Sequence, residues 1–432
     1  MIPARILPFV VPFLMLALVA PAPAAEIESG PMLGHVTGSE AHFWIKASGE
    51  ATVGIRLSTT SDLEDYPLAD EVKLEEASDF MATVKVTGLE PATRYQYQIT
   101  LDGEPEGGPA AFSTAPAEGE DGRVRIAFTS CIGREGALAT AGWAEMAENA
   151  DADLVLLLGD NHYADTTARE GQSAAYLDHR SVPGFRDLAP RVPIYAIWDD
   201  HDYGPNDSDG TADGKETSLA TFQDFWANPS YGEPTNPGIY YHFQRSGIDF
   251  FMLDVRYHRS PNSAPDDDEK TVLGARQLEW LKDGLRASEA KIKIVASGSE
   301  WQMHGHRDSW TSFGRERAEI LDFMRDEGVT GVLLISGDRH FTGGYQIRGE
   351  VIEVTSGPLG AQNYPTKNLP EMFLNQGEGK MFSVFEIDTA PELPKVQLEI
   401  HRAGAGIVER RDLTWPQILG EEKLEYLPVP DE

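Results

Sequence analysis

Six short apolar segments after residue 123 each end in side chains that can bind a metal ion. Such segments, separated by amphipathic stretches, are typical of the buried strands of an α/β layered domain. We predict strands at residues 124–129, 154–158, 193–198, 249–253, 292–297 and 332–335. Helices are predicted at residues 137–149, 275–288 and 315–326, and β-rich stretches beyond residue 351 predict mixed sheets.

The residues that directly follow these strands carry the chemistry, because the carboxyl ends of parallel strands meet at one edge of a sheet. The runs are Ser130-Cys131, Gly159-Asp160-Asn161-His162-Tyr163, Trp198-Asp199-Asp200-His201, Asp254-Val255-Arg256, residues 300–306 and Gly337-Asp338-Arg339-His340. One aspartate after a strand often only caps a helix. Converging carboxylates, however, repel one another and are costly to bury unless cations neutralise them. The sequence therefore predicts a multinuclear metal site, with oxygen donors that suit calcium and with thiolate, phenolate and imidazole donors that suit a transition metal.

Cys131 is the only cysteine of the chain, so an intramolecular disulfide is excluded. It could be a free, buried, apolar side chain. We favour a metal ligand because exported proteins rarely keep an unpaired cysteine and because this one ends the first strand of the layered domain.

Residues 1–24 have the pattern of a secretory signal peptide: one arginine, a short apolar run and a small-x-small cleavage site. The alternative is a retained N-terminal anchor, but the apolar run is short for a transmembrane helix. We expect a periplasmic or extracellular protein without a stable membrane anchor.

Residues 25–115 are predicted to form a small β-sandwich of the fibronectin type III kind, and residues 88–95 resemble its tyrosine-corner turn. We favour a structural packing role for this domain over a binding role. A Pro/Gly/acidic linker at 114–122 separates it from a second domain at 123–432.

The charge of the chain excludes some partners. It has 70 acidic and 36 basic residues, for a formal net charge of −34. Nucleic-acid binding needs stripes of Lys and Arg, so specific binding of nucleic acid is not expected. The sequence also contains no G-x-S-x-G, P-loop or H-E-x-x-H motif.

From about residue 123 to 411 the chain resembles the PhoD-like alkaline phosphatases, within the calcineurin-like metallophosphoesterases. The resemblance is carried by the strand-end runs above, above all Trp198-Asp199-Asp200-His201 and Ser130-Cys131. It implies an α/β fold, a layered αββα metallophosphoesterase domain with mixed sheets, preceded by the small β-sandwich.

The resemblance also implies cofactors and ligands, namely one Fe3+ and one or two Ca2+. Carried over residue by residue, the expected metal ligands are Cys131, Asp160, Tyr163 and His340 for iron, with Asp160 bridging to calcium beside Asp200 and Asp338. Further metal or substrate contacts are expected at Asn161, Asn206, Arg259 and Arg339.

The implied activity is hydrolysis of small-molecule phosphate esters by in-line attack of a metal-bound oxygen. His201 would stabilise or protonate the leaving alkoxide. Arg256 would clamp a phosphate oxygen, or else form a structural salt bridge with an aspartate. Alternatives are a phosphodiesterase or phospholipase of the same family and, more distantly, a secreted calcium-dependent binding protein. That last alternative predicts an exposed aromatic patch on the sandwich and an incomplete metal centre.

Overall fold

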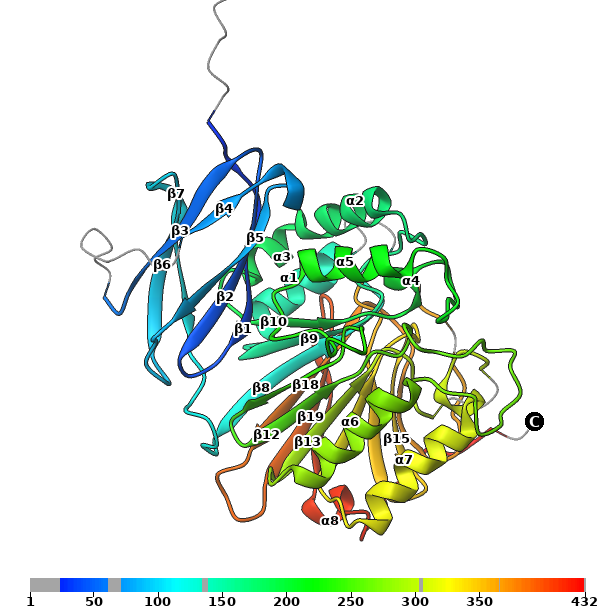
Figure 1. The fold of residues 1–432 in the computed structure, drawn as a ribbon. Helices are drawn as coiled ribbons and strands as arrows, with labels where there is room; N and C mark the ends of the chain where they lie inside the picture. Colours follow the sequence, from blue (N-terminus) through cyan, green and yellow to red (C-terminus); the bar gives the residue numbers. More distant parts are fainter. Residues whose placement is uncertain (1–23, 61–70, 134–138, 303–305, 365, 431–432) are drawn as a thin grey trace, which may run out of the picture.

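The computed structural model describes residues 24–430 except 61–70, 134–138, 303–305 and 365 (Figure 1). The predicted signal peptide and the alternative of a retained anchor fall on residues 1–23, outside the described part. None of the described helices is both long and apolar enough to cross a membrane.

The N-terminal region is a β-sandwich of two antiparallel sheets (Figure 1). The first has the order β1-β2-β5 and the second β4-β3-β6-β7. The strands are β1 (Ile27–Val36), β2 (Glu40–Ala47), β3 (Ala51–Ser58), β4 (Val72–Leu74), β5 (Met81–Thr87), β6 (Arg94–Leu101) and β7 (Glu104–Ser113). Phe43, Tyr97 and Phe112 pack between the sheets. The predicted tyrosine corner is present, since the Glu90 N–H donates to the Tyr95 hydroxyl at 2.9 Å.

The second region contains a mixed six-stranded sheet of order β10-β9-β8-β18-β19-β20. Its strands are β8 (Arg123–Thr129), β9 (Leu154–Leu158), β10 (Ile194–Ile197), β18 (Met381–Asp388), β19 (Lys395–Arg402) and β20 (Gly406–Leu413). Strands β8, β9 and β10 are parallel, as their apolar composition requires, because parallel strands are buried on both faces.

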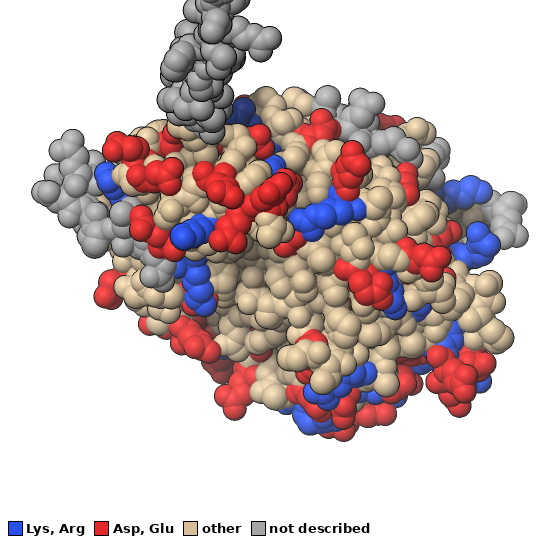
Figure 2. All heavy atoms as spheres, turned by 45° about the horizontal axis from the view of Figure 1, so that its top comes forward, with Lys and Arg blue, Asp and Glu red and all other residues tan. Residues whose placement is uncertain are grey.

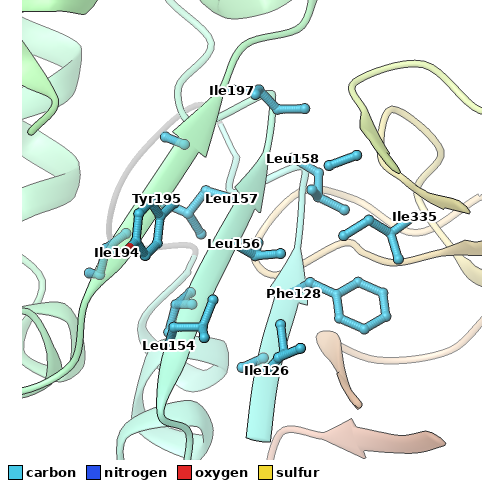
Figure 3. Close-up of a cluster of buried hydrophobic side chains, with 14 of the residues drawn as sticks. Ile126, Phe128, Leu154, Leu156, Leu157, Leu158, Ile194, Tyr195, Ile197 and Ile335 are labelled. Atoms are coloured by element: carbon cyan, nitrogen blue, oxygen red, sulfur yellow. The ribbon is translucent and has the colours of Figure 1, made fainter. Parts of the chain in front are cut away.

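A mixed seven-stranded sheet of order β11-β12-β13-β14-β16-β15-β17 lies against the first. Its strands are β11 (Tyr241–Arg245), β12 (Ile248–Met252), β13 (Ile292–Ser297), β14 (Val332–Ser336), β15 (Thr342–Ile347), β16 (Val351–Thr355) and β17 (Met372–Gln376). Figure 3 shows Ile335 of β14 beside Phe128 and Leu158 of the six-stranded sheet, so the main core lies between the two sheets.

Helices cover the outer faces of both sheets (Figure 1). On the six-stranded side lie α1 (Thr140–Asn149), α2 (Arg169–Arg180), α3 (Pro183–Leu188), α4 (Asp200–Tyr203) and α5 (Lys215–Phe225). On the other side lie α6 (Gly274–Ala287) and α7 (Gly314–Asp326), whose apolar stripes pack on β12, β13 and β14. A short α8 (Trp415–Ile418) follows β20. The predicted layered αββα domain with mixed sheets is confirmed, and helices α2 to α5 are additions to the sequence prediction.

Candidate metal centre

Three strands end in the same unusual way. Cys131 after β8, Asp160 after β9 and Asp338 after β14 all have positive φ, at 55°, 53° and 64°. An L-residue other than Asn, Asp or Gly rarely adopts this left-handed conformation, and it costs free energy unless the surroundings impose it. Asp tolerates this conformation, so the strain argument applies to Cys131, where it supports a functional role for the end of β8.

Glycines permit the strand ends to approach each other. A Cβ on Gly159 would lie 2.6 Å from the Cβ of Asp199, and one on Gly337 would lie 2.6 Å from the carbonyl oxygen of Leu158. Neither position has room for a side chain. The Gly-Asp pairs at 159–160 and 337–338 thus bring carboxylates from different sheets to one place.

The first donor group contains the four predicted iron ligands. Donor atoms of Cys131, Asp160 and His340 all lie within 4.8 Å of one another. The Tyr163 hydroxyl donates to Asp160 Oδ2 at 2.9 Å and lies 3.1 Å from His340 Nε2. His340 Nδ1 contacts the carbonyl oxygen of Gln362, which leaves Nε2 facing the other donors.

Carboxylates make up the adjoining groups. Sets of donors within 4.8 Å are formed by Asp160, Asp200 and His201, by Asp199, Asp200 and Asp338, by Glu300, His306 and Asp338, and by Asp200, Asp207 and Asp308. Asp160 belongs to both this side and the thiol side, as expected for a bridging ligand. All six predicted metal ligands therefore lie together.

Unpartnered buried oxygens show that these residues suit cations. Asp160 Oδ1 and both oxygens of Glu300, in buried side chains, and Asp338 Oδ2, in a partly buried one, accept no hydrogen bond from any described residue, although Arg339 Nε lies 3.2 Å from Glu300. Burial, followed by the charge of Asp200, raises the pKa of Asp338 to about 6. Uncompensated carboxylates at this density are unfavourable, and hard cations would supply the missing charge.

His201 lies between the two sides. Its Nδ1 contacts Asp165 Oδ1, and its ring centroid is 4.1 Å from that of Tyr163. Burial opposes protonation of the imidazole, but the charges of Asp200 and Asp165 outweigh it and raise its pKa above 6.5. The contact with Asp165 fixes the orientation of a ring that shares a donor group with Asp160 and Asp200.

Of the two roles expected for Arg256, the structure favours the structural ion pair with an aspartate over the phosphate clamp. The side chain is fully buried, and all five N–H donors are used inside the protein. Its guanidinium binds Asp308 through two nitrogens at 2.6 and 3.1 Å, Asp199 at 2.6 Å, and the oxygens of Ser299 and Ser208. The other alternative, a structural ion pair, describes its place: Arg256 holds the carboxylates that line the centre.

The remaining candidates divide by exposure. Arg259 is buried and donates to Asp308, so it extends the Arg256 network. Asn161 donates to the Ile197 carbonyl at 2.9 Å and keeps a buried Oδ1 without a donor among the described residues. Asn206 is exposed, donates to Asp207 and belongs to none of the donor groups found in the described part. Arg339 is the cation at the rim: its side chain is 19% exposed, its Nη1 lies 2.7 Å from His306 Nε2, and its Nε lies 3.2 Å from Glu300.

The sequence prediction assigned no individual role to five residues of the centre: Asp199, Asp207, Glu300, His306 and Asp308. Asp199, Glu300 and His306 were visible as strand-end donors. Asp308 lies ten residues or so beyond the end of β13, and no local pattern marks it.

Comparisons with known proteins agree with this architecture. The sequence model of the family described as "PhoD-like phosphatase" matches residues 126–390. The model of a "Domain of unknown function (DUF7800)" matches residues 24–118. Alkaline phosphatase D of Bacillus subtilis is 25% identical over 333 residues, which are 65% of this chain and 56% of that protein. Purple acid phosphatase 23 of Arabidopsis thaliana is 23% identical over 87% of this chain and 76% of its own length. The solved structure of PhoD covers 91% of this chain and 94% of its own, with a TM-score of 0.73 at 15% identity.

Two facing mixed sheets, helices on both outer faces and donors at the strand ends define a metallophosphoesterase fold. Within that class, the chain belongs to the PhoD-like phosphatase family.

Proposed function

We propose that this chain is an exported, metal-dependent alkaline phosphatase that hydrolyses small phosphate esters and releases inorganic phosphate. The observation that carries the proposal is Asp160, whose carboxylate belongs both to the group with Cys131 and His340 and to the group with Asp200 and His201. One shared carboxylate between two unlike donor sets fits two unlike metal ions. Export is inferred from the leader-like residues 1–24.

In the proposed centre, Cys131, Asp160, Tyr163 and His340 would hold Fe3+, and Asp160, Asp200 and Asp338 would hold Ca2+. Asp200, Asp207 and Asp308, whose donor atoms lie within 4.8 Å of one another, provide oxygens for a second calcium. The bound ions would supply Lewis acidity to the phosphoryl oxygens and a nucleophile at neutral to alkaline pH.

The chain's own residues complete the site. His201 would protonate the leaving oxygen, and Asp165 would be the positioning residue that fixes the ring. Arg339, at the rim, provides a cation for the phosphoryl group. Arg256 forms ion pairs with Asp199 and Asp308 and so holds these two carboxylates in position around the site.

The distant alternative, a calcium-dependent binding protein, predicted an exposed aromatic patch on the sandwich. The exposed large apolar side chains among the described residues are Tyr364, Leu393, Ile407 and Val429, and none belongs to the sandwich. The donor groups above also argue against an incomplete metal centre.

The test is phosphate release from p-nitrophenyl phosphate by the wild-type protein and by Cys131→Ser, before and after treatment with a calcium chelator and calcium add-back. We expect Cys131→Ser to be inactive and chelation to be reversible. Ser130→Ala is the matched control, because its hydroxyl lies 3.1 Å from Cys131 Sγ but is not a proposed ligand. Full activity of Cys131→Ser would contradict the proposal. Including bis-p-nitrophenyl phosphate in the same assay decides between monoester and diester hydrolysis.

A further inference from the structure

The segment from Leu359 to Tyr364 runs across the thiol side of the centre. The N–H of Leu359 donates to Ser130, and those of Gly360 and Ala361 donate to the carbonyl oxygen of Cys131. The side chain of Ala361 packs on Cys131 and Tyr163. Backbone hydrogen bonds therefore fix the path of this segment up to the rim of the site.

Tyr364 stands at the rim end of that segment. Its N–H donates to the carbonyl oxygen of His340 at 3.3 Å. Its ring stacks on the His340 imidazole, with centroids 4.6 Å apart and planes at 11°. The imidazole covers one face of the phenol ring, yet the side chain remains 48% exposed. An aromatic face is thus held in a fixed orientation and open to solvent, directly beside a proposed metal ligand.

Isolated exposed apolar residues are common and need no explanation. Tyr364 differs from Leu393, Ile407 and Val429, the other exposed large apolar residues described, because it alone is aromatic and contacts the donor group. A planar group bound at the centre through its phosphate would find this ring within reach, and parallel aromatic rings attract each other beyond the effect of buried area.

We propose that Tyr364 is a specificity-determining residue that stacks on the alcohol part of the substrate. The preferred substrates are phosphate esters whose alcohol carries an aromatic or heteroaromatic ring. This inference rests on the proposed phosphatase function and adds a substrate class to it.

The experiment measures kcat/KM of the wild-type protein, Tyr364→Leu and Tyr364→Phe for phenyl phosphate and for cyclohexyl phosphate, which is similar in size but not planar. Each variant is compared with the wild type on the same ester, so the different reactivity of the two leaving groups cancels. We expect Tyr364→Leu to lower the value for phenyl phosphate by about three- to tenfold relative to cyclohexyl phosphate. Tyr364→Phe, which keeps the ring, should leave that ratio unchanged. Leu393→Ala is the control for an exposed apolar residue away from the centre.

Equal losses on both esters in Tyr364→Leu would overturn the inference, because a ring that only supports His340 affects every substrate alike. Unchanged kcat/KM values for both esters in Tyr364→Leu would overturn it as well. These results leave the proposed function intact if the wild type hydrolyses both esters. A wild-type protein that hydrolyses neither ester overturns the function itself and this inference with it.

Discussion

The molecule buries ionisable groups of opposite sign in two places, and it neutralises them by different means. At the sheet edges, carboxylates such as Asp160, Asp338 and Glu300 converge. Under the sandwich, the buried groups are basic, with His35 at the contact with β10 and Arg180 at the end of α2. Both kinds of buried group are costly to remove from water, but only the carboxylates are neutralised by bound metal ions in the proposed centre.

The basic region needs no counter-ion. Burial lowers the pKa of His35 to about 4, so its imidazole is neutral at pH 7. Arg180 stays charged, because burial lowers its pKa only to about 9. Its guanidinium carbon lies 3.8 Å from the Trp44 ring centroid and 4.9 Å from that of Phe225, and none of the ion pairs between described residues includes it. Aromatic faces and the carbonyl oxygen of Phe225 replace carboxylates as its partners.

The carboxylate region can become neutral only by gaining protons or binding cations, and burial raises the pKa of Asp160 well above its usual range. An imidazole becomes neutral by losing a proton at neutral pH, whereas several clustered carboxylates would each have to gain one. Arg256 neutralises part of the negative charge through Asp199 and Asp308. The part that remains lies on the proposed metal ligands. Acidic residues are also scattered over the surface in Figure 2, but there water solvates them.

Among the substitutions considered, Asp160→Asn is expected to have the largest effect on the carboxylate region. Because Asp160 belongs to both donor sides, we expect both metals to be lost and phosphate release to fall by about a thousandfold, as removal of several kcal/mol of Lewis-acid stabilisation implies. Metal content and phosphate release are the measurements. Asp249→Asn is the control, since Asp249 is equally buried but binds His242 and Ser288 away from the centre. Normal metal content in Asp160→Asn would contradict its bridging role.

Arg256→Met tests the part of the carboxylate region that the protein neutralises itself. Asp199 would be left buried without its cation and Asp308 would keep only Arg259, so we expect a loss of about 3–5 kcal/mol in the free energy of unfolding. Chemical denaturation measures it. A second substitution, Asp199→Asn, should recover part of the loss, because Arg256 is the cation paired with Asp199. If Arg256→Met alone were as stable as the wild type, the ion pairs of Arg256 with Asp199 and Asp308 would not contribute to stability.

His35→Gln tests neutralisation by deprotonation. The folded-state pKa lies below the ordinary value of 6.5, so the folded protein binds fewer protons than the unfolded chain between pH 6.5 and about 4. Stability is therefore present above pH 6.5 and is lost as pH falls, by about 2 kcal/mol between pH 7 and 5. The charged and titratable groups around His35 are His42, Glu40, Lys85, Arg245 and Tyr195.

Thermal unfolding of the wild type and of His35→Gln across this pH range measures the effect. The variant should lose less stability on acidification than the wild type. Parallel curves would mean that His35 is not the group that titrates.

Arg180→Met gives the smallest expected effect and sharpens the comparison with Arg256→Met. The substitution removes the guanidinium but leaves no buried carboxylate unpaired, so the expected loss is about 1–2 kcal/mol, close to that of a desolvated cation–π contact. Denaturation of both variants under the same conditions compares them. If Arg180→Met proved as destabilising as Arg256→Met, the distinction between the two regions would fail.

The sequence was informative where a local pattern carries the physics. Apolar runs mark the strands, and the residues after them mark the edge at which Cys131, Asp160, Tyr163 and His340 meet. It was uninformative where the partner is distant. Arg256 binds Asp308, 52 residues further along the chain, and nothing near either residue indicates the pair. The stacking of Tyr364 on His340 and the contact of His201 with Asp165 likewise arise only when separate loops fold together.

The most direct test of the account is the metal content of the purified wild-type protein and of Cys131→Ser, measured by inductively coupled plasma mass spectrometry. The account predicts one iron and one or two calcium ions per wild-type chain, and loss of iron with retention of calcium in Cys131→Ser. A wild-type protein that is active without iron, or a Cys131→Ser protein that keeps its iron, would contradict the proposed two-sided centre.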